Sequence, residues 1–160
     1  MESKYKYGCV LGELESQPYN IKLINPSDLM EVNGKTVEPY PHVTILYGLH
    51  REVSINEVKE IVRKIHPFEI SLVSVSSFEQ EDHDVLKWDV QSRTLNRLNR
   101  DLCELPYTTD FPNYEPHVTI AFLKPGAGKK YNKKVNPIRI RVKFIEFTKA
   151  NGLKWVYKLI

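Results

Sequence analysis

The pentapeptide PHVTI stands at residues 41–45, within EPYPHVTILYGLH (38–50), and it returns at residues 116–120, within YEPHVTIAFLKPG (114–126). In an extended strand the side chains alternate between two faces, so the His and Thr of each copy share one face. The Val and Ile of each copy occupy the other face, which is expected to lie against a core. A duplicated core strand has no need for polar His and Thr, so the repeat indicates a functional site built from two halves.

The segments around the two copies carry the patterns of strands and amphipathic helices. The 54–65 helix is expected to begin with a capping box formed by Ser54 and Glu57, and the 92–105 helix with Ser92 as its cap. Turn signals in residues 16–41 predict a loop with short helical turns. Strands are expected at 5–14, 42–47, 68–80, 84–92, 117–123, 138–148 and 153–160.

This order of elements predicts an α+β fold. The repeated strand suggests two pseudo-symmetric halves, with antiparallel sheets facing a central cleft and the helices on the outside. Because no stretch reads as a linker, residues 1–160 are expected to form a single bilobal domain.

The composition is that of an ordinary globular protein, with 41% hydrophobic and 27% charged residues and a net charge of +3. No stretch resembles a signal peptide or a membrane span, so a cytoplasmic location without membrane attachment is expected. Cys9 and Cys103 lack metal-ligand spacing and are expected to be buried free thiols. Residues 123–143 are rich in Lys and Arg without any acidic residue, which fits either a solvated strand face or a surface that attracts phosphate.

Two imidazoles and two hydroxyls that meet in one cleft suit the cleavage of a phosphodiester. One imidazole removes a proton from the attacking oxygen and the other protonates the leaving oxygen, with no metal or cofactor needed. The hydroxyls donate hydrogen bonds to the non-bridging oxygens. The candidate catalytic residues are therefore His42, Thr44, His117 and Thr119, and the sequence leaves open which His is the base.

The two motifs, read as PHVTIL and PHVTIA, resemble those of the 2H phosphoesterase superfamily. That superfamily includes bacterial 2′-5′ RNA ligase-like proteins and 2′,3′-cyclic nucleotide phosphodiesterases. The resemblance implies a bilobal α+β fold and metal-independent catalysis by the same four residues.

Within the superfamily, PHVTILYGLH and EPHVTIAFLKPGAGKKY resemble small phage-encoded members such as the anti-CBASS nucleases. These enzymes destroy the cyclic oligonucleotides that bacteria use as antiviral signals, with the 2′-OH beside a 3′-5′ bond as nucleophile. The resemblance implies a cyclic oligonucleotide or short RNA-like substrate and a location in the host cytoplasm. No protein partner can be inferred.

Further substrate contacts are expected from aromatic and charged residues outside the two motifs. Aromatic rings stack on nucleobases, although Trp residues are more often part of a core. Glu146 and Trp155 also resemble a C-terminal Glu and Trp that the anti-CBASS group uses around a base. The glycine-containing loop that follows the second motif is read either as a lid or as a flexible turn. The candidate substrate-binding residues are Tyr7, Trp88, Lys124, Glu146 and Trp155.

Two other functions fit the same residues. The first keeps the chemistry and acts on RNA ends, 2′-5′ linkages or 2′,3′-cyclic phosphates, although the modest net charge disfavours long RNA. The second is a nucleotide-sequestering protein without catalysis, which would not require two acid–base groups.

Overall fold

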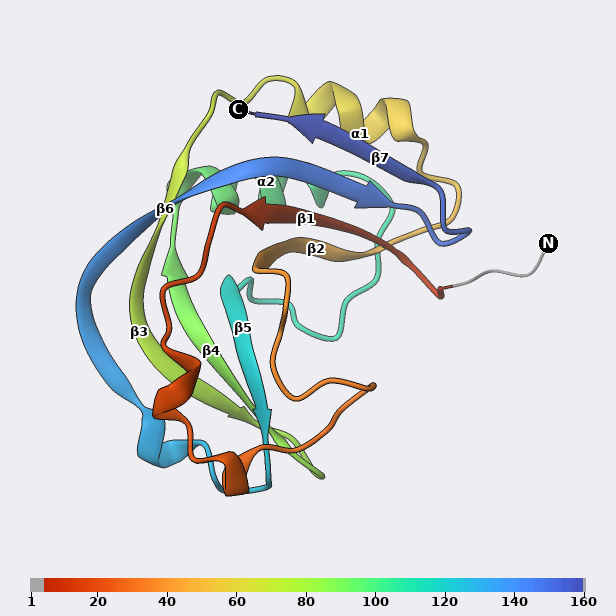
Figure 1. Ribbon diagram of the computed structural model, residues 1–160. Coiled ribbons are helices and arrows are strands. Elements are labelled where there is room, and N and C mark those ends of the chain that lie inside the picture. Colours follow the sequence, from red (N-terminus) through yellow and green to blue (C-terminus); the bar gives the residue numbers. More distant parts are fainter. Residues whose placement is uncertain (1–4, 160) are drawn as a thin grey trace.

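Seven antiparallel strands form the framework of the computed structural model, which describes residues 5–159 (Figure 1). They pair in the order β1-β2-β5-β4-β3-β6-β7. Strands β2 and β5 begin at His42 and His117, the histidines of the two PHVTI copies. The strands are β1 (Gly8–Leu14), β2 (His42–Leu49), β3 (Glu69–Glu79), β4 (Asp84–Gln91), β5 (His117–Leu123), β6 (Lys133–Thr148) and β7 (Lys154–Lys158).

The long strand β6 belongs to two parts of this framework. Its first half pairs with β3, and its second half pairs with β1 and β7. The strands β2, β1, β6 and β7 form what we call the upper sheet, and β5, β4, β3 and β6 form the lower sheet. The two sheets share β6 and meet again where β2 touches β5, which confirms the predicted α+β fold with two antiparallel halves.

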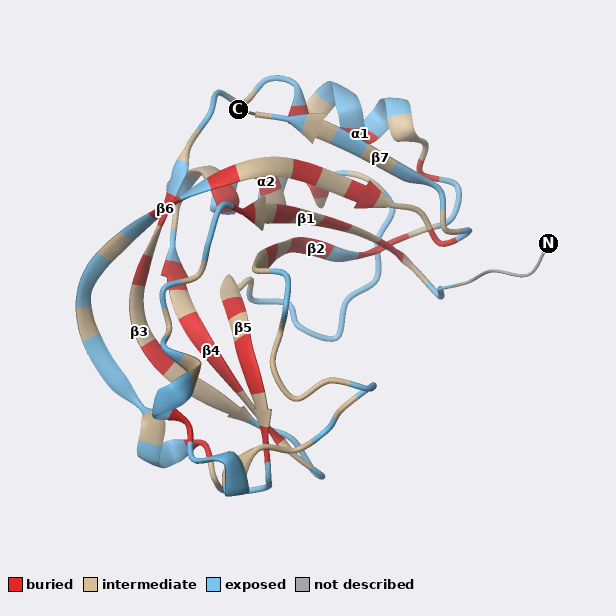
Figure 2. Cartoon of the chain, viewed as in Figure 1, coloured by how far each residue is buried: buried red, intermediate tan, exposed pale blue. Residues whose placement is uncertain are grey.

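Both α-helices pack against the upper sheet, α2 (Arg93–Leu102) on β2 and α1 (Ile55–Val62) on β6. The predicted capping box of Ser54 and Glu57 is present, and the Ser92 hydroxyl accepts the N–H of Leu95. Both caps satisfy backbone donors that a helix start leaves free. The leucines of α2 are buried, and so are the alternate residues of β1 that face the core (Figure 2).

In residues 5–159, no α-helix covers the core face of the lower sheet. Residues 15–41 cover it instead, with two 3₁₀ turns, η1 (Ile21–Leu23) and η2 (Pro26–Asp28). The indole Nε1 of Trp88 on β4 donates to Oε1 of Gln17 at 3.1 Å, and Tyr19 packs its ring edge-on against the indole. The two halves are thus alike in their strands and different in what covers them.

Within residues 5–159, no helix combines the length and the apolar character that crossing a membrane would require.

Candidate active site

The two His-Thr strands touch at one residue pair, Val43 opposite Val118. Both valines have no exposed surface and lie in the core. Because side chains alternate along a strand, the residues that flank this pair point to the opposite face. The antiparallel register places Thr44 across from His117, and it places His42 across from Thr119, so the structure brings the four predicted catalytic residues together. We call them the quartet.

The two imidazoles are held in the same way. Nδ1 of His42 lies 2.9 Å from the carbonyl oxygen of Tyr40, and Nδ1 of His117 lies 3.1 Å from that of Glu115. Since a carbonyl can only accept a hydrogen bond, Nδ1 carries the proton in both rings. Nε2 of each neutral ring is then the free acceptor, available to a substrate.

The proline of each PHVTI copy supports this geometry. Pro41 and Pro116 favour extended backbone at the residue before them, whose carbonyl is the partner of Nδ1. Their own carbonyls accept backbone N–H groups of the neighbouring strands, Pro41 from Leu14 and Pro116 from Val90. Each histidine is therefore anchored to a second strand just before its own strand begins.

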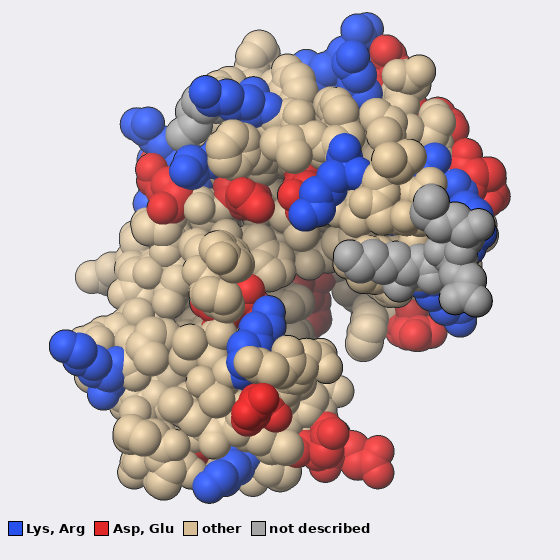
Figure 3. Space-filling model, turned by 45° about the vertical axis from the view of Figure 1, so that its right-hand side comes forward, with Lys and Arg blue, Asp and Glu red and all other residues tan. Residues whose placement is uncertain are grey.

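Past the valine pair, two side chains donate hydrogen bonds to carbonyls of β2. The hydroxyl of Tyr114 donates to the Thr44 carbonyl and the amide of Asn99 donates to the Ile45 carbonyl, both at 2.8 Å. Burial raises the pKa of Tyr114, so its hydroxyl remains a donor. These bonds hold Thr44 in place while β2 and β5 diverge, and the molecular surface is hollowed between the upper and lower parts of the protein (Figure 3).

A charged pair on β4 lies beside the second motif. Lys87 is opposite Thr119 and Asp89 is opposite His117, so both side chains share the face of the quartet. Only 6% of Lys87 is exposed, which makes it a buried cation next to the candidate catalytic residues. The upper sheet has no such cation opposite its motif: Glu13 is opposite His42, and Leu11 is opposite Thr44.

Hydrogen bonds from β3 stabilise this pair. The hydroxyls of Ser74 and Ser76 donate to Asp89 at 2.6 and 2.9 Å, and Nζ of Lys87 donates to Ser76 at 2.7 Å and to Asp89. Burial opposes the charge of Asp89, but these three donors outweigh it, so the pKa of Asp89 is lowered. Asp89 is therefore expected to stay ionised beside His117.

The environment of His117 favours its neutral form. Burial is the largest cause that lowers the pKa of His117 below the usual 6.5, and the charges of Lys87 and His42 act in the same direction. The hydrogen bond to the Glu115 carbonyl and the charge of Asp89 oppose them without reversing the shift. At neutral pH His117 is consequently ready to accept a proton.

The Lys87→Met substitution tests this electrostatic arrangement. Removing the positive charge raises the pKa of His117, so the acidic limb of kcat/KM against pH is expected to move to higher pH. Asp89→Asn is expected to move the limb to lower pH, because it removes the charge that favours the imidazolium. The exposed Lys134→Met serves as a control that leaves the limb in place, and shifts of the same sign for both β4 variants would contradict this account.

Among the predicted substrate-binding residues, Tyr7 shares a cavity with members of the quartet. Tyr7, Thr44 and His117 line one cavity of about 370 Å³. The ring of Tyr7 meets Tyr47 edge-on at 5.8 Å and stacks on His50 at 6.0 Å. An aromatic wall thus flanks the upper side of the quartet.

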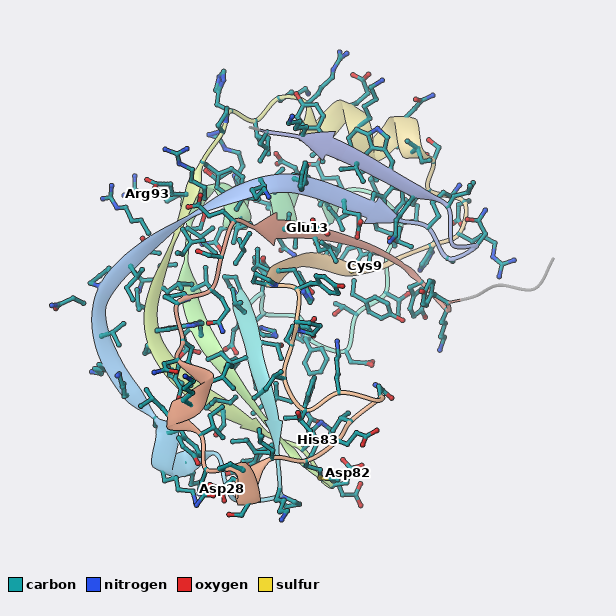
Figure 4. The ribbon with its side chains drawn as sticks, viewed as in Figure 1. Cys9, Glu13, Asp28, Asp82, His83 and Arg93 are labelled. Atoms are coloured by element: carbon teal, nitrogen blue, oxygen red, sulfur yellow. The ribbon has the colours of Figure 1, made fainter. Side chains whose placement is uncertain are left out.

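Glu146 lies on the same face of the upper sheet as Thr44. Leu11 on β1 pairs with both, so Glu146 is two strands from Thr44, or about 10 Å. Its carboxylate lies 3.7 Å from Nζ of Lys154. Cys9 lies on β1 (Figure 4), two residues before the Leu11 that pairs with Glu146. Burial and the charge of Glu146 raise the pKa of Cys9 to about 12, so the thiol is protonated and unreactive.

The structure does not place either tryptophan beside the quartet. Trp88 is opposite Val118 and only 3% exposed. Its side chain points into the core, on the other face of β4 from Lys87 and Asp89. Trp155 is opposite the buried Phe147, which puts it on the core face of the upper sheet, away from Thr44. Both rings pack against the core rather than beside the quartet.

Lys124 lies away from the quartet as well. It follows the far end of β5, about 17 Å along the strand from Thr119, and its backbone N–H donates to the Asp28 carbonyl. Figure 4 shows Asp28 and His83 at this lower end of the molecule. The structure therefore gives Lys124 no contact with a phosphate held by the quartet.

The glycine-containing loop after β5 is anchored, which does not fit a lid. Its Gly128 N–H donates to the buried carboxylate of Asp84 at 2.9 Å, and a Cβ there would lie 2.6 Å from Ser77. The Tyr131 hydroxyl, in η3 (Lys129–Tyr131), donates to Asp28. These bonds tie the loop to β4 and to η2, and Gly128 lies close against Ser77 of β3.

Two groups of residues at this site were not among those expected from the sequence. Phe111 and Tyr114 come from the 106–116 connection, whose path the sequence does not define, and no signal pointed to them. Lys87 and Asp89 had a signal, since charges at i and i+2 of a strand share one face. Within residues 5–159, no three His, Cys, Asp or Glu side chains gather as ligands for a metal ion.

Two antiparallel sheets that join at a pair of His-x-Thr strands, with both imidazoles on one face, define a two-histidine phosphoesterase. Residues 34–151 match the 2′-5′ RNA ligase superfamily, and the chain belongs to that superfamily. It is accordingly a phosphodiesterase of the 2H type. A comparison with curated proteins finds no match.

Solved structures share the fold at low sequence identity. The protein TT0787 of Thermus thermophilus aligns over 94% of this chain and 95% of its own, with 17% identity and a TM-score of 0.56. LigT of E. coli, solved in complex with 3′-AMP, aligns over 96% of each chain with 17% identity and a TM-score of 0.49. The first of these supports the fold assigned above.

Proposed function

We propose that this protein cleaves 3′-5′ phosphodiester bonds in cyclic oligonucleotides of the kind that serve as bacterial antiviral signals. The observation that carries the chemistry is the matched pair of imidazoles, each with Nδ1 bonded to a backbone carbonyl and Nε2 free. The resemblance to phage anti-CBASS nucleases supports the choice of substrate. The protein would then act in the cytoplasm of an infected host.

In the first step, we assign the base to His117, because its lowered pKa keeps it neutral. Its Nε2 takes the proton of the 2′-OH, and the 2′ oxygen attacks phosphorus. The bond from phosphorus to the 5′ oxygen breaks, and the protonated His42 gives its proton to that oxygen. The products are a 2′,3′-cyclic phosphate and a free 5′-OH.

In the second step, water opens the cyclic phosphate and the histidines exchange roles. His42, now neutral, takes a proton from water, and the protonated His117 returns its proton to the 2′ oxygen. Each histidine ends in its starting state, and the product is a 3′-phosphate. Thr44 and Thr119 donate to the non-bridging oxygens, where negative charge accumulates in both transition states.

The superfamily favours one alternative substrate class. Its name refers to 2′-5′ RNA linkages, and the same residues would serve RNA ends or 2′,3′-cyclic phosphates. The net charge of +3 is small for a protein that follows a long RNA backbone. A sequestering protein without catalysis would not need two imidazoles with free Nε2 atoms.

The test is incubation in EDTA with a panel of cyclic di- and trinucleotides, linear RNA, 2′-5′ oligoadenylate and 2′,3′-cyclic nucleotides. We expect linearisation of a cyclic oligonucleotide and complete resistance of its 2′-deoxy analogue, which lacks the nucleophile. Preference for RNA or 2′-5′ linkages would support the alternative, and tight binding without turnover would support sequestration. Loss of all activity in EDTA would show that the two-histidine mechanism is wrong.

A further inference from the structure

A second aromatic cavity borders the quartet on the side of the lower sheet. It has a volume of about 390 Å³, and His117 and Thr119 form part of its wall. Phe78 and Phe122 supply aromatic rings from β3 and β5, and Phe111 supplies another from the 106–116 connection. None of these phenylalanines belonged to the predicted site.

The two cavities share part of their walls. Phe111, Glu115 and His117 line both the cavity that contains Tyr7 and the cavity that contains Phe122. Phe111 is 80% exposed, so its ring is open to contact from a bound molecule. The candidate catalytic centre therefore has an aromatic cavity on each side.

The lining of the second cavity suits a nucleobase better than a phosphate. The residues that line it within the described part of the chain include no Lys or Arg, and most of the lining is apolar. Phe122 has His83 edge-on at a centroid distance of 6.2 Å, and its ring borders the cavity. Gln80 and Asn113 contribute amides, which can pair with the edge of a base, while rings bind its face.

We propose that this second cavity binds the nucleobase on one side of the scissile phosphate, while the cavity of Tyr7 binds the base on the other side. This inference rests on the proposed function, because it takes the phosphate to be bound at the quartet. It defines the substrate as an internal phosphodiester with a nucleoside on each side. A 2′,3′-cyclic mononucleotide would fill only one of the two cavities.

The test uses the Phe122→Leu variant, which keeps an apolar side chain and removes the aromatic face. The substrates are adenylyl-adenosine and two analogues, each lacking one of the two bases. We expect kcat/KM for the complete dinucleotide to fall about 10-fold, as for the loss of one stacking contact, and to stay unchanged for one of the two abasic analogues. Phe68→Leu, which lies outside both cavities, is the matched control.

An equal fall on all three substrates, or no fall on any, would overturn the inference. A binding measurement separates this failure from that of the proposed function. A 2′-deoxy dinucleotide with 2-aminopurine at one or the other position resists cleavage, and stacking quenches its fluorescence. We expect Phe122→Leu to relieve quenching at one position only. Quenching that depends on Phe122 without cleavage of any substrate would refute the proposed function alone, and cleavage that does not depend on Phe122 would refute this inference alone.

Discussion

Replacement of either His42 or His117 by Ala is expected to lower kcat about 10²–10⁴-fold, because each variant removes one proton transfer from both steps. KM is expected to change little, since the threonines and the two cavities remain in place. The double variant should lose little more than the worse single variant, because the two histidines act as one unit. Initial rates with a cyclic oligonucleotide in EDTA measure all three effects.

The matched control is His66→Ala, which removes an exposed imidazole from the loop after α1. It should retain full activity, and all variants should keep the thermal unfolding temperature of the wild type within a few degrees. Activity of His42→Ala or His117→Ala within a factor of ten of wild type would refute the assignment of that residue as an acid or base.

The repeated pentapeptide made the fold predictable from sequence, and with it the meeting of its four polar residues. Each copy begins a strand, with Val and Ile on the face toward the core and His and Thr on the opposite face. Val43 and Val118 pair with each other and both face the core. The His and Thr residues that flank them therefore all lie on the opposite face. Local pattern and strand geometry were sufficient here.

The substrate contacts were less predictable, because they depend on which face a side chain takes. Trp88 was chosen for its ring, yet its neighbours Lys87 and Asp89 face His117 and Thr119 while the indole enters the core. Glu146 and Trp155 are neighbours on adjacent strands but lie on opposite faces of the upper sheet. The register of β6 with β1 and β7 decides which face of the sheet each of these side chains occupies. Register arises from tertiary pairing rather than from local sequence.

The two copies of PHVTI differ in environment although their letters are the same. His117 has the buried Lys87 and the half-buried Asp89 on the adjoining strand, whereas the residue opposite His42 is Glu13. A reaction that starts with one neutral and one protonated imidazole needs such an asymmetry. In the proposed mechanism the pentapeptide supplies the reacting groups, and the strands beside it distinguish their roles.

Replacement of Thr44 or Thr119 by Val is expected to lower kcat about 10²-fold, the effect of losing one donor to a developing oxyanion. Val has nearly the same shape as Thr, so the strand and the core behind it are retained. The Ser variants keep the hydroxyl and should stay within a few-fold of wild type. The pH of half-maximal kcat/KM should not move in any of them, because the histidines are unchanged.

Thr94→Val, which removes a hydroxyl from α2 outside the quartet, is the control and should leave the rate unchanged. The four quartet variants separate phosphate binding from structural support. If Ser restores activity and Val does not, the hydroxyl is the active group at that position. If Val retains activity and Ser does not, the threonine methyl supports the strand instead. Phosphate binding at this centre would then have to come from other donors, such as Lys87, which is opposite Thr119 on the lower sheet.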